Sequence, residues 1–355
     1  MKQRNYDLDF FKLYYAFIIV GYHFYNTTGA HFFRGNTSVS FFLLVSGMLL
    51  FESFEKQRFK GLTLTPNRFF IYRYARFFPS IFVSYIFAEI ILRFIIRRTS
   101  LKDTVLCFFD DFWEVLLIKM NGLNCDKAFL NSPAWTMSCI FLVGCIFWCL
   151  LYVDKKRFVY LILPVSLIIG FGLSVHLRSG DHKMWIGFTT AGMVRAWLLM
   201  GLGYYCRRLG LFIRELNLTR LGIILLTAIE LLCHIFASII MTYHCNNALI
   251  NFTELLFCIA AAIGFSGQSL LVKLLGSLPV SRSFADASMA IYLVHRPIIG
   301  YFAFRFGSPD YYNQKALFLL VLFFGCILFQ IATKWFEKLC THIVKWINNH
   351  CFVDK

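Results

Sequence analysis

The chain has 355 residues, of which 59% are hydrophobic and 15% are charged, with a mean hydropathy of +0.65. This composition excludes an ordinary soluble globular protein, in which charged residues make up about 25% of the chain. The formal net charge of +16 does not indicate nucleic-acid binding, because excess Lys and Arg in a membrane protein is typical of cytoplasmic loops and lipid headgroup contacts. We therefore expect a multi-pass protein of the cell inner or plasma membrane, in contact with membrane lipids and with no nucleic-acid partner.

Apolar segments recur along the whole chain. A helix needs about 20 predominantly apolar residues to cross the roughly 30 Å hydrocarbon core of a bilayer. Segments that approach this length lie at residues 8–27, 38–55, 77–96, 133–153, 158–175, 186–206, 221–243, 250–272, 285–304 and 316–336. Residues 105–119 are less apolar, and we expect an interfacial or re-entrant piece there.

The hydropathy pattern predicts an all-α bundle of about ten transmembrane helices. No internal repeat and no polar linker is visible, so residues 1–355 are expected to form one integral-membrane domain without a separate soluble domain. If the N-terminus is cytoplasmic, the inner loops hold most of the Lys and Arg, as membrane topology requires. The even number of helices then places both termini in the cytoplasm.

The 12 cysteines are scattered singly, mostly in apolar segments, with no CxxC pair and no His/Cys spacing typical of a metal site. Cysteines in this setting usually act as small buried hydrophobic residues. We expect no metal ion.

The first apolar segment contains two ionisable residues, Lys12 and His23. At about 100° per residue, an interval of 11 residues puts both on one helix face, about 16 Å apart along the axis. Ionisable groups are costly in lipid and usually have a function there. Histidine, with a pKa near 6.5, is suited to take a proton from a hydroxyl group. Alternatively, His23 is bonded to a neighbouring helix, and Lys12 extends to the membrane surface.

Three arginines lie shortly before the third apolar segment, at Arg68, Arg73 and Arg76. Residues three apart are neighbours on a helix surface, and arginine binds phosphate oxygens through two hydrogen bonds. We expect these arginines to bind the phosphates of a phosphate-bearing ligand or, alternatively, those of lipid headgroups.

Three further groups of polar residues stand out. Ser46 precedes a glycine in an apolar helix, where small residues permit close helix packing. Asn131 and Trp135 open the fourth segment and suit a sugar ligand, although tryptophan is also frequent at membrane surfaces. Tyr292 and His295 are three residues apart and share one helix face, facing either a ligand cavity or a polar seam between helices.

Five segments, taken together and in this order, resemble the membrane-bound acyltransferase 3 family, whose bacterial members O-acylate cell-surface carbohydrates and some lipids. They are DFFKLYYAFIIVGYH at 9–23, FFLLVSGMLLF at 41–51, FIYRYARFFPS at 70–80, NSPAWTMS at 131–138 and SMAIYLVHRPI at 288–298. The resemblance implies transfer of an acyl group, most often acetyl, from acyl-CoA to a hydroxyl of an envelope polysaccharide or glycolipid.

The resemblance also implies roles for individual residues. His23 and Lys12 would be catalytic. The donor, acetyl-CoA or another acyl-CoA, would be bound by Arg73, Arg76, Arg68 and Ser46. The carbohydrate or glycolipid acceptor would be bound by Trp135, Asn131, Tyr292 and His295.

Two features depart from the family pattern. The family more often has arginine at the position of Lys12, and many relatives carry a carboxylate a few residues after the tryptophan, where this chain has none. Three other carboxylates lie in apolar segments, at Glu89, Glu230 and Glu254. Any one of them could orient the imidazole of His23, and the sequence does not choose among them. The rival interpretations are a transporter, for which inverted repeats are expected, and a non-catalytic component of a polysaccharide export system.

Overall fold

The computed structural model describes residues 5–27, 35–121, 130–176, 185–186, 189–243, 247–306 and 314–351. Within these ranges the chain is helical, apart from turns and one short antiparallel pair, β1 (Trp185–Ile186) and β2 (Thr189–Thr190). The predicted all-α fold class is confirmed.

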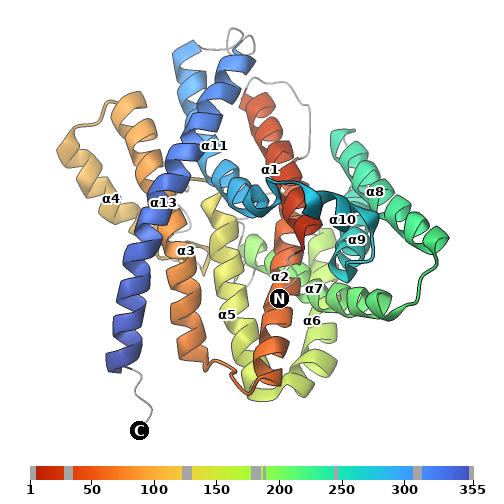
Figure 1. The fold of residues 1–355 in the computed structure, drawn as a ribbon. Coiled ribbons are helices and arrows are strands. Elements are labelled where there is room, and N and C mark those ends of the chain that lie inside the picture. Colours follow the sequence, from red (N-terminus) through yellow and green to blue (C-terminus); the bar gives the residue numbers. More distant parts are fainter. Residues whose placement is uncertain are drawn as a thin grey trace.

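Figure 1 shows how the helices are arranged. In chain order they are α1 (Tyr6–Thr27), α2 (Val39–Phe59), α3 (Pro66–Ala88), α4 (Leu101–Val115), α5 (Ala134–Arg157), α6 (Leu163–His176), α7 (Ala191–Glu215), α8 (Arg220–Thr242), α9 (Asn247–Ser266), α10 (Leu270–Ser277), α11 (Phe284–Phe306) and α13 (Lys315–Cys351). The π-helical pieces η2 (Glu89–Ile96) and η4 (Phe158–Ile162) continue α3 and α5, and short 3-10 turns are η1 (Gly35–Ser38), η3 (Lys119–Asn121) and η5 (Ser281–Ser283). Each of the ten predicted segments overlaps one of these helical stretches.

Five helical stretches of the described chain are long and apolar enough to cross a membrane. They are Pro66–Ile96, Ala134–Leu173, Arg220–Thr242, Leu249–Ser266 and Lys315–His342. Other helices of similar length, such as α1 and α11, contain the polar residues of the predicted site. The protein is therefore a multi-pass helical membrane protein, while the count of ten crossings and the orientation of the termini stay predictions.

Local sequence explains where several helices begin and bend. Pro66 opens α3 directly after the extended residue Thr65, where the missing N–H of proline costs no helical hydrogen bond. The side chain of Ser100 caps α4 by accepting a hydrogen bond from the Asp103 N–H. Asp154 has non-helical backbone angles and kinks the stretch formed by α5, η4 and α6.

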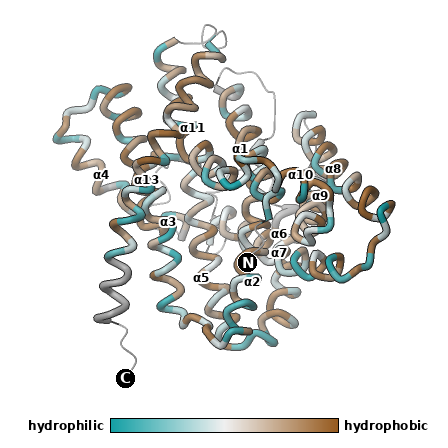
Figure 2. The backbone as a smooth tube through the Cα atoms, in the orientation of Figure 1, coloured by the Kyte–Doolittle hydropathy of each residue, from teal (hydrophilic) through white to brown (hydrophobic). Residues whose placement is uncertain are grey.

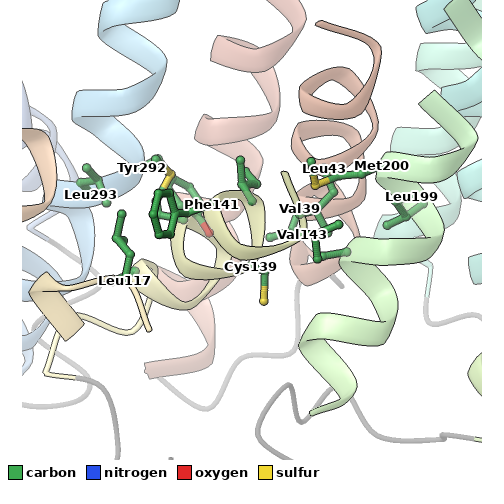
Figure 3. Packing of buried hydrophobic residues seen from close by; sticks show 14 of the residues in the cluster. Val39, Leu43, Leu117, Cys139, Phe141, Val143, Leu199, Met200, Tyr292 and Leu293 are labelled. Atoms are coloured by element: carbon green, nitrogen blue, oxygen red, sulfur yellow. The ribbon is translucent and has the colours of Figure 1, made fainter. Parts of the chain in front are cut away.

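Two packed cores hold the helices together. In the larger core α1 packs along α11, and α5 packs against α3 and α7; Figure 3 shows its centre. The second core is formed by residues of α1, α2, α8 and α9. Figure 2 shows hydrophobic residues along α8 and hydrophilic residues around the turn between α2 and α3.

Helices α2 and α7 cross at small residues. A Cβ atom at Gly47 would overlap the backbone of Met200, and one at Gly203 would lie 2.6 Å from the backbone nitrogen of Met48. Such close approach is typical of membrane helices that pack through glycine. Ser46 is half-buried beside this crossing.

Candidate functional site

Two histidines meet where α1 packs against α11. The imidazole rings of His23 and His295 have their centres 5.3 Å apart, with ring planes 26° from parallel. His295 has no exposed surface. The structure thus brings together the predicted catalytic histidine and a residue predicted to bind substrate, although 271 residues separate them along the chain.

The hydrogen bonds of His295 define its tautomer. Nδ1 lies 3.1 Å from the carbonyl oxygen of Ile291, one turn earlier in α11. A carbonyl oxygen only accepts, so Nδ1 carries the hydrogen, and in the neutral ring Nε2 keeps a lone pair. Nε2 is buried and has no hydrogen-bond partner among the residues that the structure describes.

A proline next to the pair explains a further contact. Pro297 lies inside α11 and has no N–H to donate to the carbonyl of Leu293, four residues earlier. The side-chain amide of Asn131, which is fully buried, donates to this carbonyl at 2.8 Å. Asn131 therefore satisfies a backbone group that the proline leaves without its helical partner.

The start of α5 makes two more hydrogen bonds to α11. The Tyr292 hydroxyl donates to Thr136 Oγ1 at 2.7 Å, and Arg296 Nε donates to Ser132 Oγ at 3.2 Å. Trp135, half-buried, packs against the larger core. Thr136 and Arg296 were missed from sequence, although each adjoins a predicted site residue. Figure 3 shows α11 beside α5 at this level.

Lys12 lies away from the two histidines, near the start of α1. Its Nζ is 2.8 Å from Asp9 Oδ1 on the same helix. At 1.5 Å per residue, Lys12 is about 16 Å from His23 along the axis. The structure does not bring these two predicted catalytic residues together.

The embedded carboxylates contact other groups. Glu89 accepts a hydrogen bond from the Tyr85 hydroxyl at 2.9 Å. Glu230 and Asp7 are both buried and face each other beside Gly264. Neither carboxylate lies at the ring of His23.

Glu254 belongs to a third buried group. Its Oε1 accepts from Ser40 Oγ at 2.7 Å, and Arg195 donates to the same hydroxyl at 2.6 Å. Arg195 is also 3.7 Å from Glu254. This ion pair neutralises the charge of half-buried Arg195 and occupies the last of the three candidate carboxylates.

Arg73, one of the residues predicted to bind the donor, is turned into the protein. Its Nη2 donates to the carbonyl of Ile140 at 3.0 Å, and its guanidinium carbon is 5.4 Å from the ring centres of both Phe69 and Phe77. A Cβ at Gly144 would lie 2.6 Å from the guanidinium. Arg73 thus ties α3 to α5.

The other predicted donor residues lie nearer the surface. Arg76 is exposed, and Arg68 is half-buried in the first turn of α3. The structure therefore gives Arg73 and Arg76 different surroundings.

A basic hollow of 360 Å³ lies between the end of α2, the turn to α3 and the end of α5. Its lining includes Arg58, Thr63, Lys155 and Lys156, together with one carboxylate, Asp154, which pairs with Arg157. Lys155 pairs with Glu55 at 2.6 Å, whereas no ion pair of Arg58 or Lys156 occurs within the described ranges. The hollow therefore presents positive charge to a ligand.

No cluster of three or more His, Cys, Asp or Glu side chains able to hold a metal ion occurs among the residues whose positions are described.

The fold is that of a helical membrane protein, and the histidine pair lies at the interface of α1 and α11. A family model described as "Acyltransferase domain" matches residues 5–350. The chain belongs to the acyltransferase 3 family, as its sequence segments predicted, and is an acyltransferase. No curated protein and no solved structure is significantly similar to it.

Proposed function

We propose that this single-domain protein transfers an acyl group, acetyl in the first instance, from acyl-CoA to a hydroxyl of an envelope polysaccharide or glycolipid. The observation that carries the proposal is the meeting of His23 with His295 at the junction of α1 and α11. Buried hydrogen-bonding side chains of Asn131 and Tyr292 adjoin this pair. Family membership supports the acyl-transfer chemistry.

His23 is the general base in the proposed reaction. The acceptor hydroxyl attacks the thioester carbonyl, and His23 takes its proton as the new C–O bond forms. The C–S bond then breaks, and the leaving thiolate receives the proton as a thiol. A positioned base of this kind contributes about 10²- to 10⁴-fold to the rate.

The donor would enter from the cytoplasm, with both termini on that side. Arg68 and Arg76 on α3 are placed to meet its phosphates, since arginine forms paired hydrogen bonds to phosphate. Arg58 and Lys156 in the basic hollow add charge of the same sign. Lys12 would attract the anionic donor from the start of α1.

Trp135, Asn131, Tyr292 and His295 would contact the acceptor from the α5 and α11 side. Ser46 would shape the path of the acyl group next to the α2–α7 crossing. Because Asn131 and Tyr292 already bond within the protein, their contact with the acceptor uses their remaining hydrogen-bonding capacity.

The test is mass spectrometry of envelope glycans and glycolipids from cells that lack the protein and are complemented with wild type or His23→Ala at equal membrane levels. We expect an added acyl mass with wild type, reduced at least 100-fold with His23→Ala. Equal acylation by the two forms would assign His23 a structural role. Unchanged acylation with altered glycan export would favour a transport or export role instead.

A further inference from the structure

We propose that His295 is the positioning residue of the site: its Nε2 accepts a hydrogen bond from His23 when that ring takes up the proton of the acceptor hydroxyl. The inference rests on the proposed function, in which His23 is the base. It assigns to a neutral histidine the part that a carboxylate commonly plays beside a catalytic histidine.

The tautomer of His295 provides the acceptor. Its Nδ1–H is bonded to the Ile291 carbonyl, so the lone pair lies on Nε2. This nitrogen is buried without a hydrogen-bond partner. An unpaired buried polar atom costs roughly 1–3 kcal/mol, and a bond formed during the reaction recovers that cost in the transition state.

The distance between the rings suits such a bond. Ring nitrogens lie about 1.2 Å from an imidazole centre and N–H···N bonds span about 3 Å, so bonded imidazoles have centres about 5 Å apart. The observed separation of His23 and His295 is 5.3 Å, with nearly parallel planes. Rotation of the side chains would bring the N–H of His23 into line with Nε2 of His295.

A purely structural role explains the contacts of His295 less well. A buried histidine that joins two helices donates to or accepts from the neighbouring helix, whereas the hydrogen bond of His295 goes to its own helix α11. Its second nitrogen is buried and has no hydrogen-bond partner on α1 or on any other described segment.

The charges around His23 and His295 favour the uptake of only one proton by the two neutral imidazoles. Arg296 follows His295 in the chain and is bonded to Ser132, so its positive charge opposes a second proton on the imidazoles. Neutral His23 has one N–H, and the imidazolium has two. The N–H that neutral His23 already carries is the donor to His295, while the opposite ring nitrogen takes the hydroxyl proton. The hydrogen bond strengthens as the His23 ring becomes positively charged, and His295 keeps its own hydrogen on Nδ1 throughout.

The substitutions His295→Gln, His295→Leu and His295→Met test this role. Glutamine offers a neutral acceptor oxygen at a similar reach, whereas leucine and methionine fill the space without a strong one. The full-length forms would be assayed in native membranes, at matched levels, for transfer of label from radioactive acetyl-CoA to membrane glycans. His23→Ala and wild type complete the set.

We expect His295→Leu and His295→Met to lower kcat by about 100-fold or more with the KM for acetyl-CoA unchanged. His295→Gln should retain activity within about 10-fold of wild type. Using two apolar replacements guards against a folding defect in one of them, and thermal unfolding in detergent identifies such a defect.

Three outcomes would overturn the inference. Wild-type rates in His295→Leu or His295→Met, with His23→Ala inactive, would remove His295 from the reaction and leave the proposed function standing. A folded but inactive His295→Gln would make His295 itself the proton acceptor. Absence of label transfer by wild type would overturn the proposed function, and the inference with it.

Discussion

The imidazole of His23 on α1 lies 5.3 Å from the imidazole of His295 on α11, at a helix interface where His295 has no exposed surface. This relationship joins the first helix of the chain to one near its end. The site therefore exists only when α1 and α11 are packed together, and substitutions that disturb the partners of α11 should reduce activity through the position of His295.

Asn131 and Pro297 should be energetically coupled. Asn131→Ala leaves the buried carbonyl of Leu293 without a partner, at a cost of about 1–3 kcal/mol. Pro297→Ala restores an N–H four residues after Leu293, so Asn131→Ala should cost less in that background. A double-mutant cycle on thermal unfolding in detergent measures the coupling; additive effects of the two substitutions would contradict it.

Arg73 and Arg76 should respond differently to substitution. Arg73→Lys loses the fork that reaches Ile140 and the contact with two phenylalanine rings, and should lower stability by about 1–3 kcal/mol. Arg76→Ala removes an exposed charge, and should raise the KM for acetyl-CoA with little effect on unfolding. The measurements are the KM for acetyl-CoA and the unfolding temperature of both variants. A stability loss in Arg76→Ala together with a raised KM in stable Arg73→Lys would contradict the prediction.

Asp111→Ala should be strongly destabilising. Asp111 pairs with Arg93, and Lys119 Nζ lies 3.8 Å from its other oxygen; all three side chains are buried. Removing one partner of a buried ion pair costs about 3–5 kcal/mol. The matched control is Lys102→Ala, an exposed position on the same helix, which should change stability by less than about 0.5 kcal/mol. Equal unfolding temperatures for the two variants would disprove the expectation.

Glu114 should make stability depend on pH. It lies on α4, which is not among the candidate membrane spans, and accepts hydrogen bonds from the backbone N–H groups of Leu130 and Asn131. Burial raises the pKa of Glu114 to about 8, from an ordinary value of 4.5. Because the folded state then binds the proton more tightly than the unfolded state, this stabilisation is complete below pH 4.5 and is lost as pH rises to about 8.

Glu114→Gln cannot ionise, so its unfolding temperature should fall less than that of wild type between pH 5 and pH 8. Thermal unfolding of both forms at the two pH values is the measurement. An identical decline in the two forms would assign the pH dependence to other groups.

The crossing of α2 and α7 should not tolerate a side chain at Gly47. A Cβ there would overlap the backbone of Met200, and forcing the helices apart costs about 1–3 kcal/mol. Gly172→Ala on α6 is the control, because nothing lies within 4 Å of a Cβ at that position. We expect the control to be neutral or stabilised by up to about 1 kcal/mol, and comparable losses at both positions would contradict the argument.

The sequence by itself determined the fold class, the positions of the helices and the family, because each depends on patterns within one segment or on the order of segments. Apolar stretches of spanning length indicate helices whichever neighbours they meet. The paired positions of Tyr292 and His295 likewise follow from helical spacing alone. Pro297 lies four residues after Leu293 and has no N–H. The sequence therefore indicates that the carbonyl of Leu293 needs a hydrogen-bond donor other than its usual helical partner.

Only the tertiary structure decided which side chains meet. The three embedded glutamates were equivalent in sequence, yet Glu89, Glu230 and Glu254 face Tyr85, Asp7 and Arg195, while His23 faces a second histidine. Lys12 and His23 share a helix but make separate contacts, and half-buried Arg73 packs against α5 while Arg76 is exposed. Helical spacing specifies the face on which a residue lies, whereas its partner depends on which helix packs against that face.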